Sequence, residues 1–312
     1  MPDLVHRWAA GFRSRHGEAR LVIPGPYAAP QGALSATLQE FLDGKRDFAF
    51  MSRELLDTDR AAFRRAHGGK EPVVIPVAMG SFRHFSFVDT MVLVVHQDNP
   101  IAGLTFKQLD GIYSAERLRG HAPVRTWGDL GLTQKEWRDQ PVVALGGGRR
   151  GMEDSAKAVV IRQRVLTVDG RVAAWNDHLP VKGDGDDKIP ARVARSPGAI
   201  GITALGHMVP GVKAIAIAER DSAPFVAPTM PNVYDGRYPL NRSIDLLVAA
   251  SPDGTVEPML AEWARFMLSR EGQSIVREQG IFLPLRGRLL QLAQAQIERV
   301  APGTQTCKRS GS

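Results

Sequence analysis

The sequence contains little cysteine and no long apolar run. Its one cysteine, Cys307, lies in a polar C-terminal stretch, so an internal disulfide and a cysteine-based zinc site are both excluded. No apolar run approaches the roughly 18 residues that a transmembrane helix needs. The eight histidines are scattered without the spacing of metal ligands. We therefore predict neither a metal site nor a cofactor.

Two functional classes also lack their signatures. The chain contains no H-E-x-x-H, G-x-S-x-G or G-K-[ST] motif, so we predict that it is not an enzyme. The formal net charge is +7, but the basic residues are spread along the chain, and no RNA-binding signature or Cys/His finger is present. We therefore predict no nucleic-acid partner. A basic protein of this kind is suited to small anions.

The pattern of apolar residues predicts an α/β protein with a largely parallel sheet. Apolar strands at 47–52, 72–80 and 90–97 alternate with amphipathic helices. Further strands are predicted at 20–25 and as one continuous strand at 211–218. Near the C-terminus, the pattern predicts two helices that are broken at Gly272 and end at Gly280.

A glycine-rich turn follows an apolar strand in the segment 142–170. Gly146, Gly148 and Gly151 match G-x-G-x-x-G, and Asp169 lies about where a dinucleotide-binding fold places its ribose-binding acid. This motif alone is weak, because any glycine-rich turn between a strand and a helix can match it. The alternatives are a dinucleotide site, a site for a smaller anion, or a solvated turn. The neighbouring pair Arg149 and Arg150 suits a compact anion.

Seven segments along the chain carry a family resemblance when they are read in order. They are FMSREL (50–55), NPIAGLTFKQLDGIYS (99–114), TWGDLGL (126–132), SPGAIGI (196–202), YPLNRSIDLLV (238–248), FMLSREGQSIV (266–276) and GIFLPL (280–285). In this order they resemble the periplasmic phosphate-binding proteins of ABC transporters, and more narrowly the PstS-like group. The resemblance covers about residues 3–286.

The resemblance implies a type II periplasmic-binding-protein fold. Each of its two lobes has a mixed or mostly parallel sheet flanked by helices, and the ligand binds between the lobes. Lobe 1 is expected to comprise residues 1–98 plus 237–312, and lobe 2 residues 99–236. The chain is expected to cross between lobes near 98–99 and again near Tyr238.

The same resemblance implies a set of ligand residues. Arg149 stands at the family's phosphate-pairing arginine, with Arg150 beside it, and Ser155 substitutes for a threonine. Ser52 is retained in the loop after the strand at 47–52. The resemblance therefore predicts an inorganic oxyanion, most simply phosphate, as the ligand. Arg53 is included as a basic companion of Ser52.

The sequence departs from the family pattern at four positions. Glu153 and Asp154 replace small residues, and Asp154 is kept as a candidate ligand residue although a carboxylate there would repel a dianion. Pro26 removes an N–H group from another expected loop. Arg53 replaces an acid that, in typical members, accepts the proton of hydrogen phosphate. A surface pair between Arg53 and Asp57 is the alternative interpretation of that arginine.

The resemblance further implies a periplasmic monomer that delivers its ligand to an ABC transporter permease. No signal peptide is visible in this chain, and we expect an upstream extension with a signal, a first strand and a phosphate loop. Two alternatives stay open. One is a binding-protein-like module that has lost anion binding, and the other is a dinucleotide-dependent enzyme using the loop at 146–151.

Overall fold

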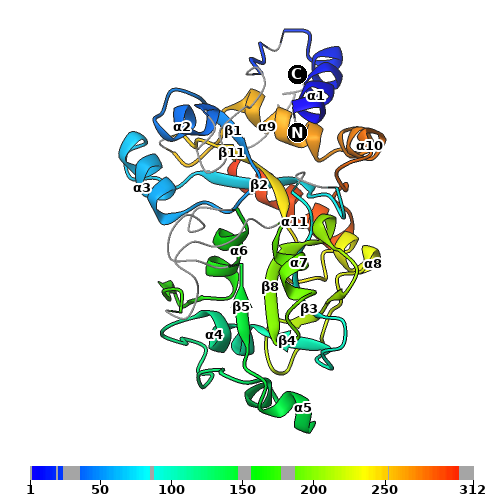
Figure 1. Ribbon diagram of the computed structural model, residues 1–312. Coiled ribbons are helices and arrows are strands. Elements are labelled where there is room, and N and C mark those ends of the chain that lie inside the picture. The colour runs from blue at the N-terminus through cyan, green and yellow to red at the C-terminus, as the bar shows by residue number, and fades with distance from the viewer. Residues whose placement is uncertain are drawn as a thin grey trace, which may run out of the picture.

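The computed structural model describes residues 2–18, 20–23, 36–84, 88–146, 156–176, 187–251 and 253–301. Its strands form two main groups, one above the other, with helices around both (Figure 1). The upper sheet has the order β1 (Phe48–Met51), β11 (Ser243–Val248), β2 (Val73–Met79). The lower sheet has the order β5 (Val143–Leu145), β8 (Ala199–Ala204), β3 (Met91–His96), β9 (Val212–Ala214). The α/β class is therefore confirmed.

The upper sheet is built around β11, which pairs with both of its neighbours in the antiparallel sense. One hydrophobic core joins this sheet to α1 (Pro2–Arg15), α9 (Pro258–Met267), α10 (Arg270–Gln279) and α11 (Gly287–Val300). In α1 the apolar residues recur at helical spacing, and Trp8 and Phe12 are fully buried. The Phe12 ring packs edge-on against Trp263 of α9 at 5.1 Å between centroids.

A smaller core lies under α2 (Ala36–Leu42) and α3 (Asp57–Ala66). Phe41 and Phe63 stack there at 5.0 Å between ring centroids, and Met51 of β1 contributes to the same cluster. The helices α2 and α3 therefore hold β1 from one side. The loop that connects β1 to α3 begins at Ser52, directly after this packed strand.

The two central strands of the lower sheet, β8 and β3, are buried on both faces. All six residues of β8 are buried, and apolar clusters lie on the two sides of the sheet. One cluster contains Phe106, Tyr113 and Trp127, and the other contains Ile189 and Val193. A strand with buried side chains on both faces is mostly apolar, which accounts for the sequence of β8, in which Thr203 is the one polar residue.

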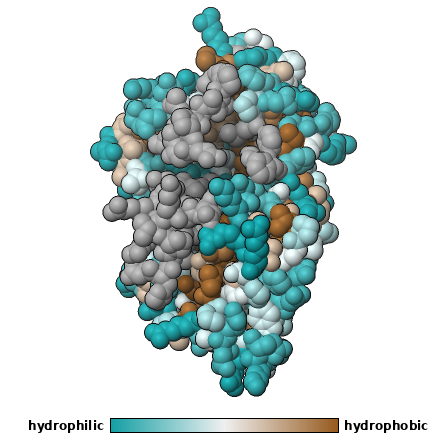
Figure 2. All heavy atoms as spheres, in the orientation of Figure 1, coloured by the Kyte–Doolittle hydropathy of each residue, from teal (hydrophilic) through white to brown (hydrophobic). Residues whose placement is uncertain are grey.

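The remaining elements connect and cover these sheets. They are β4 (Gly103–Thr105), α4 (Phe106–Tyr113), the 3-10 helix η1 (Trp127–Leu130), α5 (Lys135–Arg138), α6 (Ala156–Arg164), β6 (Thr167–Val168), β7 (Arg171–Val172), α7 (Ile189–Val193), the 3-10 helix η2 (Leu205–His207), β10 (Ala216–Ala218) and α8 (Met230–Tyr234). Within the described ranges, no helix is both long and apolar enough to span a bilayer. On the face in Figure 2, hydrophilic residues predominate and the hydrophobic ones form small separate groups.

Both sheets are less parallel than the sequence predicts. Among the described strands, the parallel pairs are β5 with β8 and β4 with β10. The other pairings are antiparallel. The lower sheet is mixed, as one of the two expected forms allows, whereas the described strands of the upper sheet are all antiparallel. Alternation of strands and helices did not reveal that β11, from late in the chain, pairs between β1 and β2.

Two predicted strands differ in the structure. Residues 20–23 form no strand, although Leu21 is buried. The predicted strand at 211–218 is two strands: β9 pairs with β3, whereas β10 pairs with β4 in a separate two-stranded sheet. Ile215, between them, is buried in the core. A continuous apolar run gives no sign of such a change of partner.

The break between the C-terminal helices lies at 268–269 and not at Gly272. Ser269 caps α10, and its hydroxyl accepts a hydrogen bond from the Gly272 N–H at 3.1 Å. Gly272 itself is helical. A Cβ there would lie 2.2 Å from the carbonyl oxygen of Phe266, so this position requires a close backbone approach. The Gly272 carbonyl also accepts a hydrogen bond from Trp8 Nε1 at 2.8 Å.

The chain passes from the upper sheet to the lower sheet between Met79 and Met91. The strand β3 pairs with β8 and β9, and its residues belong to the lower core. The predicted crossing near 98–99 follows this strand and is therefore placed too late. The predicted return near Tyr238 and the other lobe limits stay predictions.

Candidate functional site

Ser52 begins the loop that leaves the upper sheet after β1. The buried strand ends at Met51, and Ser52 is half-buried. Its carbonyl oxygen accepts a hydrogen bond from Arg242 Nη2 at 2.7 Å. The Arg242 carbonyl in turn accepts a hydrogen bond from the Gly80 N–H at 2.8 Å. The loop that carries Ser52 is thus bonded to Arg242, which is itself bonded to Gly80.

Arg53 is engaged in a buried ion pair. Its Nη1 lies 2.6 Å from Oδ2 of Asp59, and the two side chains are 14% and 4% exposed. The same Oδ2 accepts a hydrogen bond from the Leu56 N–H at 2.8 Å, which caps the start of α3. The alternative interpretation, a surface pair between Arg53 and Asp57, is therefore wrong. Asp59 takes that place because the chain turns at 54–56 and brings the third residue of α3 back toward the loop.

The C-terminus of α6 contacts the loop after β1 from below. Arg164 Nη2 lies 3.0 Å from Oε1 of Glu54, and Arg164 Nη1 donates to the Pro239 carbonyl at 2.7 Å. Gln163 Nε2 donates to the Leu55 carbonyl. These contacts join α6, which packs with the lower core, to a loop of the upper sheet. In Figure 1, α6 lies just below β2.

A second carboxylate, Asp245 of β11, lies close to this ion pair. Its Oδ1 is buried and has no hydrogen-bond partner among the described residues. Burial raises the pKa of Asp245 to about 6, while a Ser243 hydrogen bond and Arg164 oppose the rise and Glu54 adds to it. The junction of the sheets therefore combines arginines with a buried carboxyl whose pKa is raised.

Four of the predicted ligand residues lie outside the described residues. They are Arg149, Arg150, Asp154 and Ser155. Pro26 and Glu153, where the sequence departs from the family pattern, also lie outside. Of the predicted set, the structure thus places Ser52 and Arg53, and both lie in the loop after β1. The segment with the other four comes directly before α6 in the sequence.

The structure gives a different role to Asp169, the acidic residue of the dinucleotide alternative. Asp169 has a φ of 48° and, with Gly170, forms the two-residue turn between β6 and β7. Aspartate followed by glycine is a common sequence for such a turn, so Asp169 has a structural role. At the other end of the motif, Gly146 has a φ of 81°, and a Cβ there would lie 2.7 Å from the Ile202 carbonyl oxygen. Gly146 is thus explained by the close approach of β8.

The sequence analysis missed Glu54, Arg164, Arg242 and Asp245. A signal was present for the last two, since charged residues inside the apolar stretch YPLNRSIDLLV are unusual for a buried strand. Glu54 and Arg164 are 110 positions apart, and no local pattern links them. Within the described part of the chain, no cluster of three or more His, Cys, Asp or Glu residues could hold a metal ion.

Comparison with known proteins agrees with this architecture. The sequence model of a family described as "PBP superfamily domain" matches residues 29–271. The chain is 30% identical over 308 residues to the phosphate-binding protein PstS of Pseudomonas aeruginosa, in two strains, covering 95% of this chain and 84% of the relative.

Solved structures show the same fold. An ABC-type phosphate transport receptor from Vibrio cholerae superposes with a TM-score of 0.54 at 20% identity, covering 91% of this chain and 96% of that one. PstS from Borrelia burgdorferi gives 0.54 at 15% identity, covering 91% and 95%. These likenesses show a two-lobe α/β fold. With the match over residues 29–271 and the 30% identity over nearly the whole chain, they show that this chain belongs to the PBP superfamily, in the family of the phosphate-binding protein PstS.

Proposed function

We propose that this protein is a solute-binding protein that captures phosphate between its two lobes for ABC-type uptake. The observation that carries the proposal is the identity to PstS over 95% of the chain. The names of the relatives describe binding proteins and a transport receptor, which supports a binding role and not a catalytic one. Delivery to a permease in the membrane and a periplasmic location follow from the same relationship.

The proposed site combines the loop after β1 with the segment before α6. From the first come Ser52 and its companion Arg53, and from the second come Arg149, Arg150 and Ser155. Guanidinium groups, hydroxyls and free N–H groups at the start of a helix are suited to a compact oxyanion. Support comes from the contact of α6 with residues 54 and 55, which brings the lower lobe against the loop that contains Ser52.

Asp154 and Arg53 are the two residues of this proposed site that depart from the family pattern. Arg53 is already paired with Asp59, so it attracts a phosphate less strongly than an unpaired arginine would. Asp154 is compatible with a phosphate only if it accepts the ligand's proton or points elsewhere. We propose that the protein acts as a monomer, with residues 99–236 forming most of one lobe and the remaining residues most of the other.

Isothermal titration of inorganic phosphate into the purified chain tests the proposal, with sulfate as the comparison. We expect micromolar or tighter phosphate binding and much weaker sulfate binding. Arg149→Ala should weaken phosphate binding by about 100-fold or more, as expected when a charge-assisted contact is lost. Arg138→Ala is the matched control, since Arg138 is exposed and pairs with its neighbour Asp139.

The titration can also contradict the proposal. No heat with either anion, from a folded chain, would favour the alternative of a module that has lost anion binding. Equal affinity for both anions would contradict phosphate as the specific ligand. An unchanged affinity in Arg149→Ala would remove that residue from the site.

A further inference from the structure

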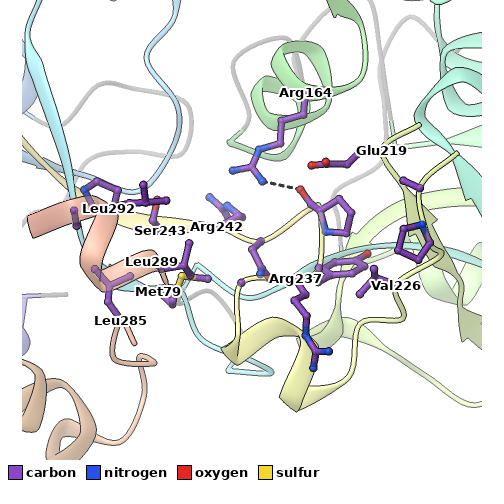
Figure 3. A pocket seen from close by; sticks show the side chains of 18 of the residues that line it. Met79, Arg164, Glu219, Val226, Arg237, Arg242, Ser243, Leu285, Leu289 and Leu292 are labelled. Carbon is purple, nitrogen blue, oxygen red and sulfur yellow. Dashed lines mark hydrogen bonds between the residues drawn. The ribbon is translucent and has the colours of Figure 1, made fainter. Parts of the chain in front are cut away.

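A cavity of about 530 Å³ lies between the upper and lower sheets, beside the segment 236–243 (Figure 3). It is bounded above by β2 and α11 and below by the segment 219–226 after β10. Its volume falls in the range of pockets that bind small organic molecules. Neither Ser52 nor Arg53 lines it, so this cavity, which we call the hinge-side cavity, is separate from the described part of the proposed phosphate site.

One wall of the hinge-side cavity is apolar. Leu289 and Leu292 project from α11 next to Leu285, with Met79 of β2 close by (Figure 3). Leu292 is 50% exposed although it lies beside the buried core of the upper sheet. An exposed leucine alone is ordinary, but a leucine that continues an apolar cavity wall offers contact area to a ligand.

The opposite wall is rich in arginine. Arg164, Arg220 and Arg242 line it, whereas Glu219 is the acidic residue of the lining. Figure 3 shows Arg164 and Glu219 across the cavity from the leucines, with Arg242 between them. Arg237 also lines the cavity, but it pairs with Asp235 at 3.1 Å. The charge of this wall therefore favours an anion over a cation.

From this arrangement we propose that the hinge-side cavity binds a medium-chain carboxylate, with its apolar chain against α11 and its carboxylate toward Arg220 and Arg242. Inorganic phosphate alone would leave the leucine wall uncovered. An apolar cation would face Arg220 and Arg242, whereas the charge of Arg164 is already paired with Glu54. A carboxylate with an apolar chain matches both walls at once.

The test uses decanoate, below its micelle-forming concentration, titrated into the full chain at saturating inorganic phosphate. We expect binding at a single site, with decyltrimethylammonium and acetate each binding at least about tenfold more weakly, because the first lacks the anion and the second lacks the chain. Since phosphate is present throughout, occupancy of the hinge-side cavity is measured apart from any phosphate site. If decyltrimethylammonium bound as tightly as decanoate, the proposal would be overturned.

Two pairs of matched variants locate the site. Leu292→Glu should abolish decanoate binding, whereas Ala295→Glu, an exposed position on the same helix outside the lining, should not. Arg220→Glu should weaken it, whereas Arg195→Glu, exposed and outside the lining, should not. Circular dichroism melts confirm that each variant is folded. Equal decanoate binding in folded Leu292→Glu and Ala295→Glu would overturn the proposal, and so would no binding to the unmodified chain.

Discussion

Glu54 and Arg164 form an ion pair, 3.0 Å from Oε1 to Nη2, that joins the loop after β1 to the end of α6. Glu54 follows the upper-sheet strand β1 and directly succeeds Ser52 and Arg53, whereas Arg164 is the last residue of α6 in the lower lobe. Arg164 also donates to the Pro239 carbonyl, so one guanidinium holds three segments together. This pair gives the two lobes a direct contact close to the loop that contains Ser52.

Loss of the Glu54–Arg164 pair should weaken the contact between the lobes. The side chains are 25% and 33% exposed, so solvent screens part of the interaction. We expect Glu54→Gln to lower the free energy of unfolding by roughly 0.5–1 kcal/mol, measured by urea denaturation. Asp139→Asn, which removes an exposed pair with Arg138, serves as the control and should leave the midpoint unchanged. A Glu54→Gln midpoint equal to that of the unmodified protein would contradict this role.

Asp245 should make the protein less stable as the pH rises from about 4 to 6. Its pKa is about 6 in the folded state, above the ordinary value of 3.8, so between these values the folded state binds more protons than the unfolded state. Stability therefore falls through this window and is level above it. Asp245→Asn removes the cost of charging the group, and we expect a gain of about 2–3 kcal/mol at pH 7 that disappears below pH 4.

Urea denaturation at a series of pH values measures this effect. Asp253→Asn is the control, because hydrogen bonds from Thr255 lower the pKa of Asp253 and give the opposite sign. It should bring no gain at pH 7. A difference between Asp245→Asn and the unmodified protein that is constant with pH would show that Asp245 does not titrate in this way.

The Arg53–Asp59 pair should contribute to stability more than to ligand affinity. Removing one partner leaves the other charge buried, so Asp59→Asn should cost about 3 kcal/mol in denaturation experiments. For Arg53→Met we expect a similar loss, with the phosphate Kd from titration changing by less than about threefold. A larger change in Kd would instead place Arg53 among the groups that contact phosphate.

Gly272 should tolerate no side chain. A Cβ there would meet the Phe266 and Met267 carbonyl oxygens at 2.2 and 2.5 Å, which neither helix can relieve without moving. We expect Gly272→Ala to lower the thermal midpoint and to cost about 2–3 kcal/mol, as overpacking does. A Cβ added at Gly17 would have no neighbouring atom within 4 Å, so Gly17→Ala is the matched control and should be close to neutral. Equal midpoints for the two variants would contradict the packing argument.

The α/β class and the main apolar elements could be predicted from the sequence, because they depend on local spacing. Trp8 and Phe12 lie on one face of α1, and β8 is mostly apolar because both of its faces are buried. The order of the seven family segments indicated the two-lobe fold from the sequence alone. The proposed ligand residues 149–155 also came from that resemblance.

Tertiary structure alone decided which distant residues meet. Asp59 and not Asp57 pairs with Arg53, because the direction of the loop at 54–56 sets which carboxylate faces the guanidinium. The strand β11 pairs between β1 and β2, so Asp245 is buried near Glu54 and Arg164. The hinge-side cavity exists because α11 and the segment 219–226 come together from separate parts of the chain. Local propensities fix helices and strands, but such long-range contacts follow from how the elements pack, and a single sequence carries no local pattern for them.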